Sequence, residues 1–262
     1  MSARTPSENQ SLKRGLAILE AYNSEKRNWG IRELSREFNI NAATVHRLVS
    51  TLTKRGYLER NAKTQRYHLG PKVIQLAANY SSQKTLIEIS LRLFKEYEKV
   101  FPYLFYLGVM SASREIICIA VYESHGPLKI TSAPGQTVSM YSSALGKLLL
   151  ANENDSFIRK LVADEPIERL TSKTVANLNG LMKQINEIRK VGYAINLGEI
   201  YEEVAAVATP VRGPDGNIVA GLSLTFPLHY LETKKLNLTE IIELAQTIGD
   251  KISEMSTRTI IR

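Results

Sequence analysis

Two short amphipathic segments near the N-terminus are separated by only a tight polar turn, and this spacing limits the folds open to the chain. Apolar residues recur at helical spacing through residues 31–38 and again through residues 41–55. Asn39 tolerates the left-handed backbone that a sharp turn between helices needs. Asn41 can cap the second helix. The pattern predicts a helix-turn-helix whose second helix presents small and hydrogen-bonding residues outward.

The sequence on either side of this pair predicts the rest of a small domain. An amphipathic helix is predicted over residues 11–22, with Ser11 as its N-cap. Residues 57–60 and 65–69 alternate apolar and polar side chains around the loop 61–64, a pattern typical of a two-stranded hairpin. A helix, a helix-turn-helix and a hairpin in this order predict a winged helix with a basic tip.

The charge of the chain is concentrated in this region. Residues 1–83 contain 14 Lys and Arg against 6 Asp and Glu, whereas residues 84–262 contain 20 of each. A compact basic module beside a neutral one is typical of a protein whose small domain contacts phosphates, although a basic face that serves only solubility has the same totals. Pattern and charge together predict that the following residues contact duplex DNA: Arg32, Asn41, Ala43, Thr44, His46, Arg47, Ser50, Lys63 and Arg66.

Three runs of this region resemble one family of DNA-binding domains. SLKRGLAILE, IRELSREFNINAATVHRLVSTLTKRGYLER and QRYHLGPKVIQLA are similar to the DNA-binding domain of the isocitrate-lyase-regulator (IclR) family of bacterial regulators. Asn39 and Asn41 stand where the family often has Gly and Pro, and both suit a turn followed by a cap. The resemblance implies a transcription regulator, repressor or activator, that binds DNA as a homodimer or a homotetramer built as a dimer of dimers.

The rest of the chain alternates predicted strands and helices. We predict a winged helix-turn-helix at residues 1–70, a linker helix at 71–84 and an effector domain at 85–262. Predicted strands cover residues 105–110, 116–121, 128–131, 193–196, 205–211 and 218–225, and predicted helices cover 86–100, 143–151, 157–161, 178–190 and 239–255. The turn-rich run 212–217 should join the last two strands as a hairpin. An antiparallel sheet flanked by helices is an α+β domain.

The same family resemblance extends over this second domain. The runs SSALGKLLLA and IRKVGYAINLGEIYEEVAAVATPVRGPDGNIVAGLSLTFP resemble its GAF-like effector domain, which implies a pocket for a small-molecule effector, often a small carboxylate or an aromatic acid. Asn196 and Ala206 depart from the pattern, because many members have Asp and Cys there, at positions where the family commonly binds its effector.

Physical features of the residues favour the same pocket. Backbone N–H groups at the start of the helix near Ala144 favour an anion. Ser223 and Thr225 lie on one face of a strand, and the amide of Asn196 can donate and accept. Plain helix caps and small polar strand residues explain these side chains without a ligand, so the resemblance decides between the two interpretations. The predicted effector-binding residues are Tyr141, Ser142, Ser143, Ala144, Asn196, Ala206, Ser223 and Thr225.

Motifs of catalysis are sparse in the sequence. It contains no HExxH, no CxxC pair, no GxGxxG after a strand and no GxxxxGK[ST], so we expect no enzyme activity, cofactor or metal site. Cys118 lies in an apolar run and is expected to be a buried thiol. Without an apolar leader or a membrane span, we expect a cytoplasmic protein. A bifunctional enzyme with a DNA-binding arm and a structural DNA protein whose second domain only oligomerises remain as alternatives.

Overall fold

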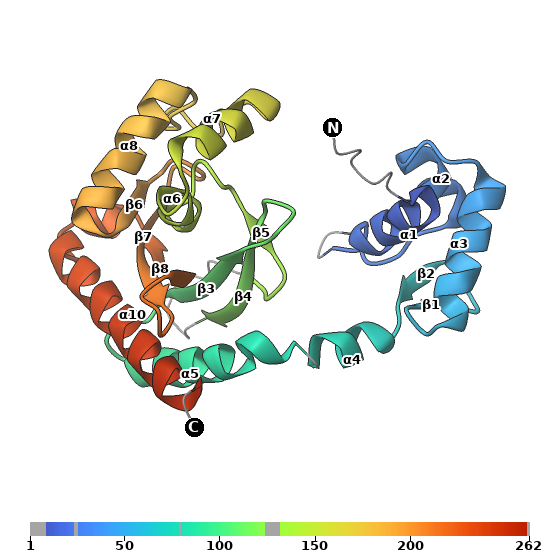
Figure 1. The fold of residues 1–262 in the computed structure, drawn as a ribbon, viewed down its shortest axis with the longest axis horizontal. Helices are drawn as coiled ribbons and strands as arrows, with labels where there is room; N and C mark the ends of the chain where they lie inside the picture. The colour runs from blue at the N-terminus through green and yellow to red at the C-terminus, as the bar shows by residue number, and fades with distance from the viewer. Residues whose placement is uncertain (1–8, 24–25, 79, 124–131, 261–262) are drawn as a thin grey trace, which may run out of the picture. The chain divides into compact units, whose positions relative to one another are not determined.

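The computed structural model describes residues 9–23, 26–78, 80–123 and 132–260, and it divides into two compact units, Met1–Ser81 and Ser82–Arg262. In the first unit three helices precede a two-stranded antiparallel hairpin and a short fourth helix (Figure 1). Its elements are α1 (Gln10–Glu20), α2 (Ile31–Glu37), α3 (Ala42–Lys54), β1 (Leu58–Arg60), β2 (Tyr67–Leu69) and α4 (Lys72–Ala78). The predicted winged helix-turn-helix is therefore confirmed.

The caps of these helices follow the local polar residues. Asn41 caps α3, since its Oδ1 accepts from Ala43 N at 2.8 Å, and Asn39 has the predicted left-handed backbone with φ 50°. The predicted cap of α1 was wrong. Asn9, not Ser11, caps this helix, because the Asn9 Oδ1 accepts from the backbone N–H groups of Ser11 and Leu12, both at 3.1 Å.

The core of the first unit includes Trp29, which lies between the helices predicted at residues 11–22 and 31–38. Trp29 is buried, and its backbone exchanges two hydrogen bonds with Tyr67 of β2, at 3.0 and 2.8 Å. The Trp29 indole N–H also donates to the Ala21 carbonyl at 3.0 Å. Trp29 thus joins the end of α1 to the hairpin. It packs with Ile18, Leu34, Ile40, Val45, Val49, Leu58 and Tyr67.

The second unit is built on a six-stranded antiparallel sheet with the strand order β5-β4-β3-β8-β7-β6. Its strands are β3 (Leu104–Met110), β4 (Ile116–Glu123), β5 (Thr137–Val138), β6 (Ala194–Leu197), β7 (Val204–Arg212) and β8 (Ile218–Pro227). Its helices are α5 (Ser81–Tyr97), α6 (Ala144–Ala151), α7 (Asp155–Asp164), α8 (Leu178–Val191), α9 (His229–Glu232) and α10 (Leu238–Ile260). The predicted α+β class is confirmed, whereas β5 and α9 were not predicted and the strand predicted at 128–131 lies outside the described residues.

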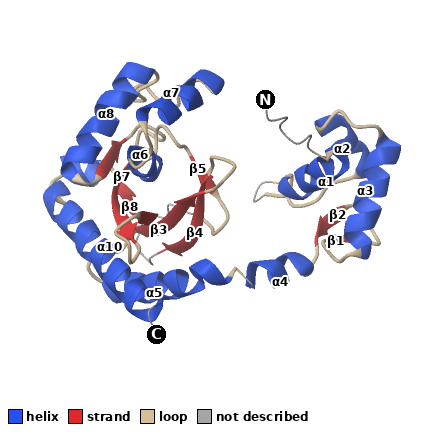
Figure 2. Cartoon of the chain, viewed as in Figure 1, coloured by secondary structure: helices blue, strands red, loops and turns tan. Residues whose placement is uncertain are grey.

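Helices cover both faces of this sheet (Figure 2). Apolar residues of α5 and α10 pack on one face against alternate residues of β7 and β8, such as Leu222 and Leu224. The other face carries α6, which packs on β7, and apolar residues of α7 and α8 belong to the same cluster as Ala206 and Ala208. Among the described residues no helix combines the length and the apolar character needed to cross a membrane.

Two glycines let α6 approach the sheet closely. A Cβ on Gly108 of β3 or on Gly221 of β8 would lie 2.5 Å from a methyl carbon of Leu145. Because a real Cβ does not come so near another carbon, a larger residue at either position would displace the Leu145 side chain, which lies in the space that these glycines leave open. The start of α6 is therefore held directly above β3 and β8.

Candidate functional site

The first candidate site is the exposed face of α3. Val45 and Val49 are buried in the core of the first unit, so the opposite side of the helix faces outward. His46 and Arg47 lie on that exposed side, together with Asn41 and Ala43 at the start of the helix. Thr44 and Ser50 are half-buried beside them, and Arg32 is exposed on α2. The arrangement presents small, polar and cationic side chains along one helical face.

The hairpin supplies two further predicted contacts, and their surroundings differ. Lys63 is exposed in the loop, where the Asn61 Oδ1 accepts from Lys63 N at 2.9 Å and from Thr64 N at 3.0 Å. Arg66 is half-buried and forms an ion pair with Glu33 of α2. Arg66 thus already has an anionic partner, and the pair ties the hairpin to the helix-turn-helix.

Glu33 also completes the N-terminus of α2. Its Oε2 accepts from the Gly30 backbone N–H at 3.0 Å. This bond, and next the hydrogen bond from Arg66, lowers the pKa of Glu33 below its ordinary value. The carboxylate is therefore ionised at neutral pH. It caps the start of α2 and, through its ion pair with Arg66, connects α2 to the hairpin.

The second candidate site lies on the sheet face covered by α6. In the strand register Asn196 is opposite Ala206, and Ala206 is opposite Thr225, so the three form one row across β6, β7 and β8. Ser223 lies in the next row, opposite Ala208. The register therefore brings together four of the predicted effector residues that are far apart in the sequence.

Two hydroxyl groups in these rows have no hydrogen-bond partner among the described residues. Ser223 is 3% exposed and Thr225 is 5% exposed, and neither side chain bonds to another described group. Neither hydroxyl oxygen is among the fully enclosed, unpartnered side-chain atoms of the described residues, so each keeps some access to solvent. Such groups are usually satisfied by water or by a bound molecule.

The start of α6 lies at the same face and also has unused donors. The Ser143 hydroxyl caps the helix, since its oxygen accepts from Gly146 N at 2.8 Å and its O–H donates to the Ser139 carbonyl at 2.5 Å. The backbone N–H groups of Ala144 and Leu145 have no acceptor among the described residues. Unused N–H groups at a helix N-terminus favour a negatively charged group.

Asn196 connects the two parts of this site. Its Nδ2 donates to the Ser142 carbonyl at 2.6 Å, and its Oδ1 accepts from Glu199 N at 3.0 Å. The amide that we predicted to contact an effector thus makes two hydrogen bonds within the protein. It holds the segment before α6 against the end of β6.

Tyr141 is directed to a different part of the domain. Its ring packs with the α6–α7–α8 cluster. Burial raises the pKa of its hydroxyl, and Glu165, Arg114 and Asp164 are the charged groups that act on it. The side chain therefore lies toward the end of α7, and only its backbone belongs to the segment that leads into α6.

A buried ion pair next to this site was missed by the sequence analysis. Lys147 of α6 pairs with Glu199, and their side chains are 1% and 9% exposed. Burial lowers the pKa of Lys147, while the carboxylate of Glu199 opposes that shift. Glu199 is fixed further by its backbone, because its carbonyl accepts from the Thr174 hydroxyl at 2.7 Å. The signal was present, since Lys147 is the one charged residue in the apolar run ALGKLLLA.

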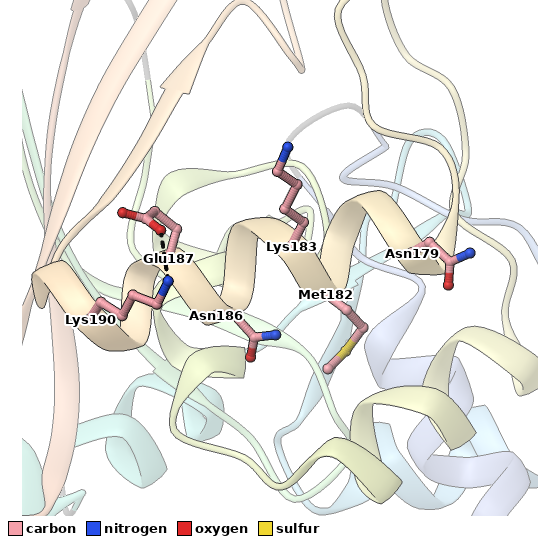
Figure 3. Close-up of a pocket in the computed structure, with 6 residues that line it drawn as sticks. All are labelled: Asn179, Met182, Lys183, Asn186, Glu187 and Lys190. Atoms are coloured by element: carbon pink, nitrogen blue, oxygen red, sulfur yellow. Dashed lines mark ion pairs between the residues drawn. The ribbon is translucent and has the colours of Figure 1, made fainter.

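A hollow of about 440 Å³ follows one face of α8, outside both candidate sites (Figure 3). It is lined by Asn179, Met182, Lys183, Asn186, Glu187 and Lys190. These side chains all come from α8, and Glu187 pairs with Lys190 at 3.6 Å. Because no second element encloses the hollow, it offers a small molecule few converging contacts.

The first unit presents an exposed polar helix within a helix-turn-helix, and the second contains an interior site that favours an anion. Together these two features define the class of ligand-responsive DNA-binding regulators. The comparisons with known proteins agree with this class. Residues 11–62 match the IclR helix-turn-helix domain, and residues 79–254 match the bacterial transcriptional regulator IclR C-terminal domain. The chain belongs to the IclR family of transcriptional regulators, with a DNA-binding and an effector-binding domain.

Individual relatives resemble the chain over nearly its whole length. The HTH-type transcriptional regulator KdgR of Escherichia coli is 27% identical over 95% of this chain and 94% of its own. A putative IclR transcriptional regulator from Silicibacter sp. TM1040 has a crystal structure with a TM-score of 0.83 at 24% identity, covering 94% and 96% of the two chains. An IclR homologue from Microbacterium hydrocarbonoxydans, crystallised with 4-hydroxybenzoate, has a TM-score of 0.82 at 20% identity, covering 94% and 99%.

Proposed function

We propose that α3 enters the major groove of duplex DNA and reads base edges with its exposed face. The outward side chains of Asn41, His46 and Arg47 supply the donors and acceptors that such reading needs. Lys63 at the hairpin tip would contact phosphates, and Arg66 would act mainly through Glu33 by fixing the hairpin. Since the partner is chromosomal DNA, we expect the regulator to act in the cytoplasm.

We further propose that a small carboxylate effector binds between α6 and β8. The observation that carries this proposal is the pair of buried, unpartnered hydroxyls on Ser223 and Thr225 beside the unused N–H groups of Ala144 and Leu145. A carboxylate would accept from the amides and the hydroxyls together. The 4-hydroxybenzoate bound to a homologue of the same fold supports this class of ligand.

Removing one of these hydroxyls is expected to weaken effector binding without changing DNA affinity in the absence of effector. Ser223→Ala should cost about 1 kcal/mol, roughly fivefold in Kd, if the hydroxyl makes one net hydrogen bond. Carboxylates would first be screened by thermal shift, because a ligand that binds the folded state raises its stability. Calorimetry with each carboxylate that binds would then compare the variant with the wild type.

Ser90→Ala is the matched control for this experiment. Ser90 is also buried, but it lies on α5, on the other face of the sheet, and donates to the Leu86 carbonyl at 2.8 Å. Its substitution should leave carboxylate affinity unchanged. Equal affinity of Ser223→Ala and wild type would show that the carboxylate binds elsewhere in the domain.

We infer that the domain binds its effector and does not transform it. Cys118 is buried in β4, and burial raises the pKa of its thiol to about 12. A thiol with this pKa is almost entirely protonated at neutral pH and is a poor nucleophile. The relatives named above are likewise regulators and not enzymes by name.

We propose that the regulator is at least a dimer and that apolar residues of the first unit form the contact. The apolar faces of the predicted helices at 71–78 and 86–100 would each suit such a contact, but α5 uses its apolar residues inside the second unit. By contrast, Ile74 and Leu76 of α4 are 73% and 53% exposed, and Leu12 and Leu16 of α1 are also exposed. Large apolar side chains left exposed on the helices of a small unit are typical of an interaction surface.

Charge on this surface is expected to weaken the dimer. The double variant Ile74→Glu with Leu76→Glu should shift the protein toward monomer in sedimentation at micromolar concentration, because two carboxylates would be buried at the contact. Val100→Glu is the control, since Val100 is 67% exposed in the second unit. A wild-type protein that sediments as a monomer while binding DNA fully would contradict the proposal.

A further inference from the structure

Tyr106 borders the proposed effector site, and sequence analysis did not identify it. In the register of β3 and β8 it is the cross-strand partner of Ser223, so both side chains point to the same face of the sheet. Ala208 of β7 is the partner of Ser223 on its other side. The row therefore runs from a small residue through the unpartnered hydroxyl of Ser223 to the ring of Tyr106, which closes the site toward β4.

The hydroxyl of Tyr106 lies among polar groups of β4 and the following segment. Besides burial, the groups that act on the pKa of this hydroxyl are Ser132, Cys118, Glu123 and Tyr201. Glu123 is in turn held by a hydrogen bond from Ser132 N to its Oε1, at 2.7 Å. No cation is among the described groups that act on Tyr106, and those described groups are two hydroxyls, a thiol and one carboxylate.

The two ends of the site thus favour different chemical groups of a bound ligand. The end at α6 has unused N–H groups of Ala144 and Leu145 and suits a carboxylate. The end at Tyr106 suits a neutral hydrogen-bonding group, because a second carboxylate there would face Glu123, and no cation among the described groups acts at this end. Burial raises the pKa of Tyr106 to about 12, so its hydroxyl keeps its proton at neutral pH and can donate.

We propose that Tyr106 determines the specificity of this site by selecting monocarboxylates that carry a hydroxyl group at the end remote from the carboxylate. This inference rests on the proposed binding of a carboxylate at the start of α6. The remote hydroxyl bonds to the hydroxyl of Tyr106, and dicarboxylates of the same length are rejected by Glu123. Effectors of this regulator are therefore hydroxy acids with a single negative charge.

Two sets of matched probes test the proposal by calorimetry on the full-length protein. One set is 4-hydroxybenzoate, benzoate and terephthalate, and the other is 4-hydroxybutyrate, butyrate and succinate. In at least one set the wild type should bind the hydroxylated acid about fivefold more tightly than the unsubstituted acid, as expected for one net hydrogen bond. The dicarboxylate of that set should bind most weakly. Tyr106→Phe should abolish the preference for the hydroxyl while leaving the affinity for the unsubstituted acid unchanged.

Tyr122→Phe is the control, because it removes the same hydroxyl from the neighbouring strand. The Tyr122 hydroxyl donates to Glu98 at 2.6 Å, and the Tyr122 ring packs edge-on against Phe105, whose side chain belongs to the opposite face of the sheet. This variant should keep the wild-type preference. An unchanged preference in Tyr106→Phe, or tightest binding of a dicarboxylate, would overturn the role of Tyr106.

The Ser223→Ala variant separates this failure from failure of the site itself. If Ser223→Ala weakens every acid that binds while Tyr106→Phe changes no preference, the carboxylate site stands and only the specificity inference fails. If Ser223→Ala changes nothing, the placement of the site fails and the inference falls with it. If none of the six acids binds to the wild type at millimolar concentration, both are overturned.

Discussion

Replacing Glu199 with Gln is expected to lower the free energy of unfolding by about 3–5 kcal/mol, since it leaves the ammonium of Lys147 buried without a counter-charge. That loss is large beside the total stability of a protein, which is about 5–15 kcal/mol. The backbone of Glu199 is also linked to the segment before α6, because the Asn196 side chain accepts from Glu199 N and donates to the Ser142 carbonyl. Urea unfolding followed by circular dichroism measures the change.

The pH dependence of the Glu199→Gln variant gives a second test. Burial already lowers the pKa of Lys147, and the carboxylate of Glu199 opposes this, so its removal should lower that pKa further. A Lys whose pKa is lower in the folded state binds fewer protons there than in the unfolded chain. The free energy of unfolding must then rise as the pH rises through the folded-state pKa of Lys147. The difference in free energy of unfolding between the wild type and the variant should therefore become smaller as the pH rises toward 10.5, the ordinary pKa of Lys.

Two controls separate the buried charge from other effects. Glu187→Gln breaks the exposed pair with Lys190 on α8 and should change the stability by less than about 1 kcal/mol. The double variant Lys147→Met with Glu199→Leu removes both charges and should recover most of the loss, since apolar residues often replace a buried pair at little cost. A Glu199→Gln variant as stable as wild type would show that Lys147 carries no buried positive charge.

Local patterns were sufficient to predict most of the secondary structure. Hydrophobic period and turn residues located α2, α3, the hairpin and the strands β7 and β8, because each signal lies within a few neighbouring residues. The pairing of Trp29 with Tyr67 was not predictable in this way. It joins segments 38 residues apart and depends on how the hairpin folds back on α1. The two-residue strand β5 exists only through its pairing with β4, so it has no pattern of its own.

In the candidate effector site too, local sequence patterns predicted the orientation of side chains along one strand but not their neighbours from other strands. Alternation along β8 was enough to predict that Ser223 and Thr225 share a face. The neighbours of that face depend on strand register, which is why Tyr106 was not found from the sequence. Asn196 was predicted to contact an effector, and in the structure its amide makes two hydrogen bonds within the protein. Residue type predicts which bonds are possible, and the fold decides which partner takes them.

Arg47→Ala is expected to weaken DNA binding strongly while leaving the fold intact. Arg47 is exposed on α3, so its truncation removes no core packing. One lost arginine contact to a base costs about 1–3 kcal/mol, and a dimer loses two, which predicts a total of about 2–6 kcal/mol, at least tenfold in affinity. The measurement is fluorescence anisotropy with a duplex that the wild-type protein has selected from random-sequence DNA.

Arg159→Ala is the matched control, because Arg159 is exposed on α7 in the second unit and its loss changes the net charge equally. It should bind the selected duplex like wild type. Salt dependence then separates the two kinds of contact that Arg47 can make. A phosphate contact predicts that the slope of log affinity against log salt falls by about 1 for each lost contact, whereas a base contact leaves the slope unchanged and relaxes specificity at one position. Affinity within twofold of wild type at matched salt would remove Arg47 from the interface and would place recognition on another face of the winged helix.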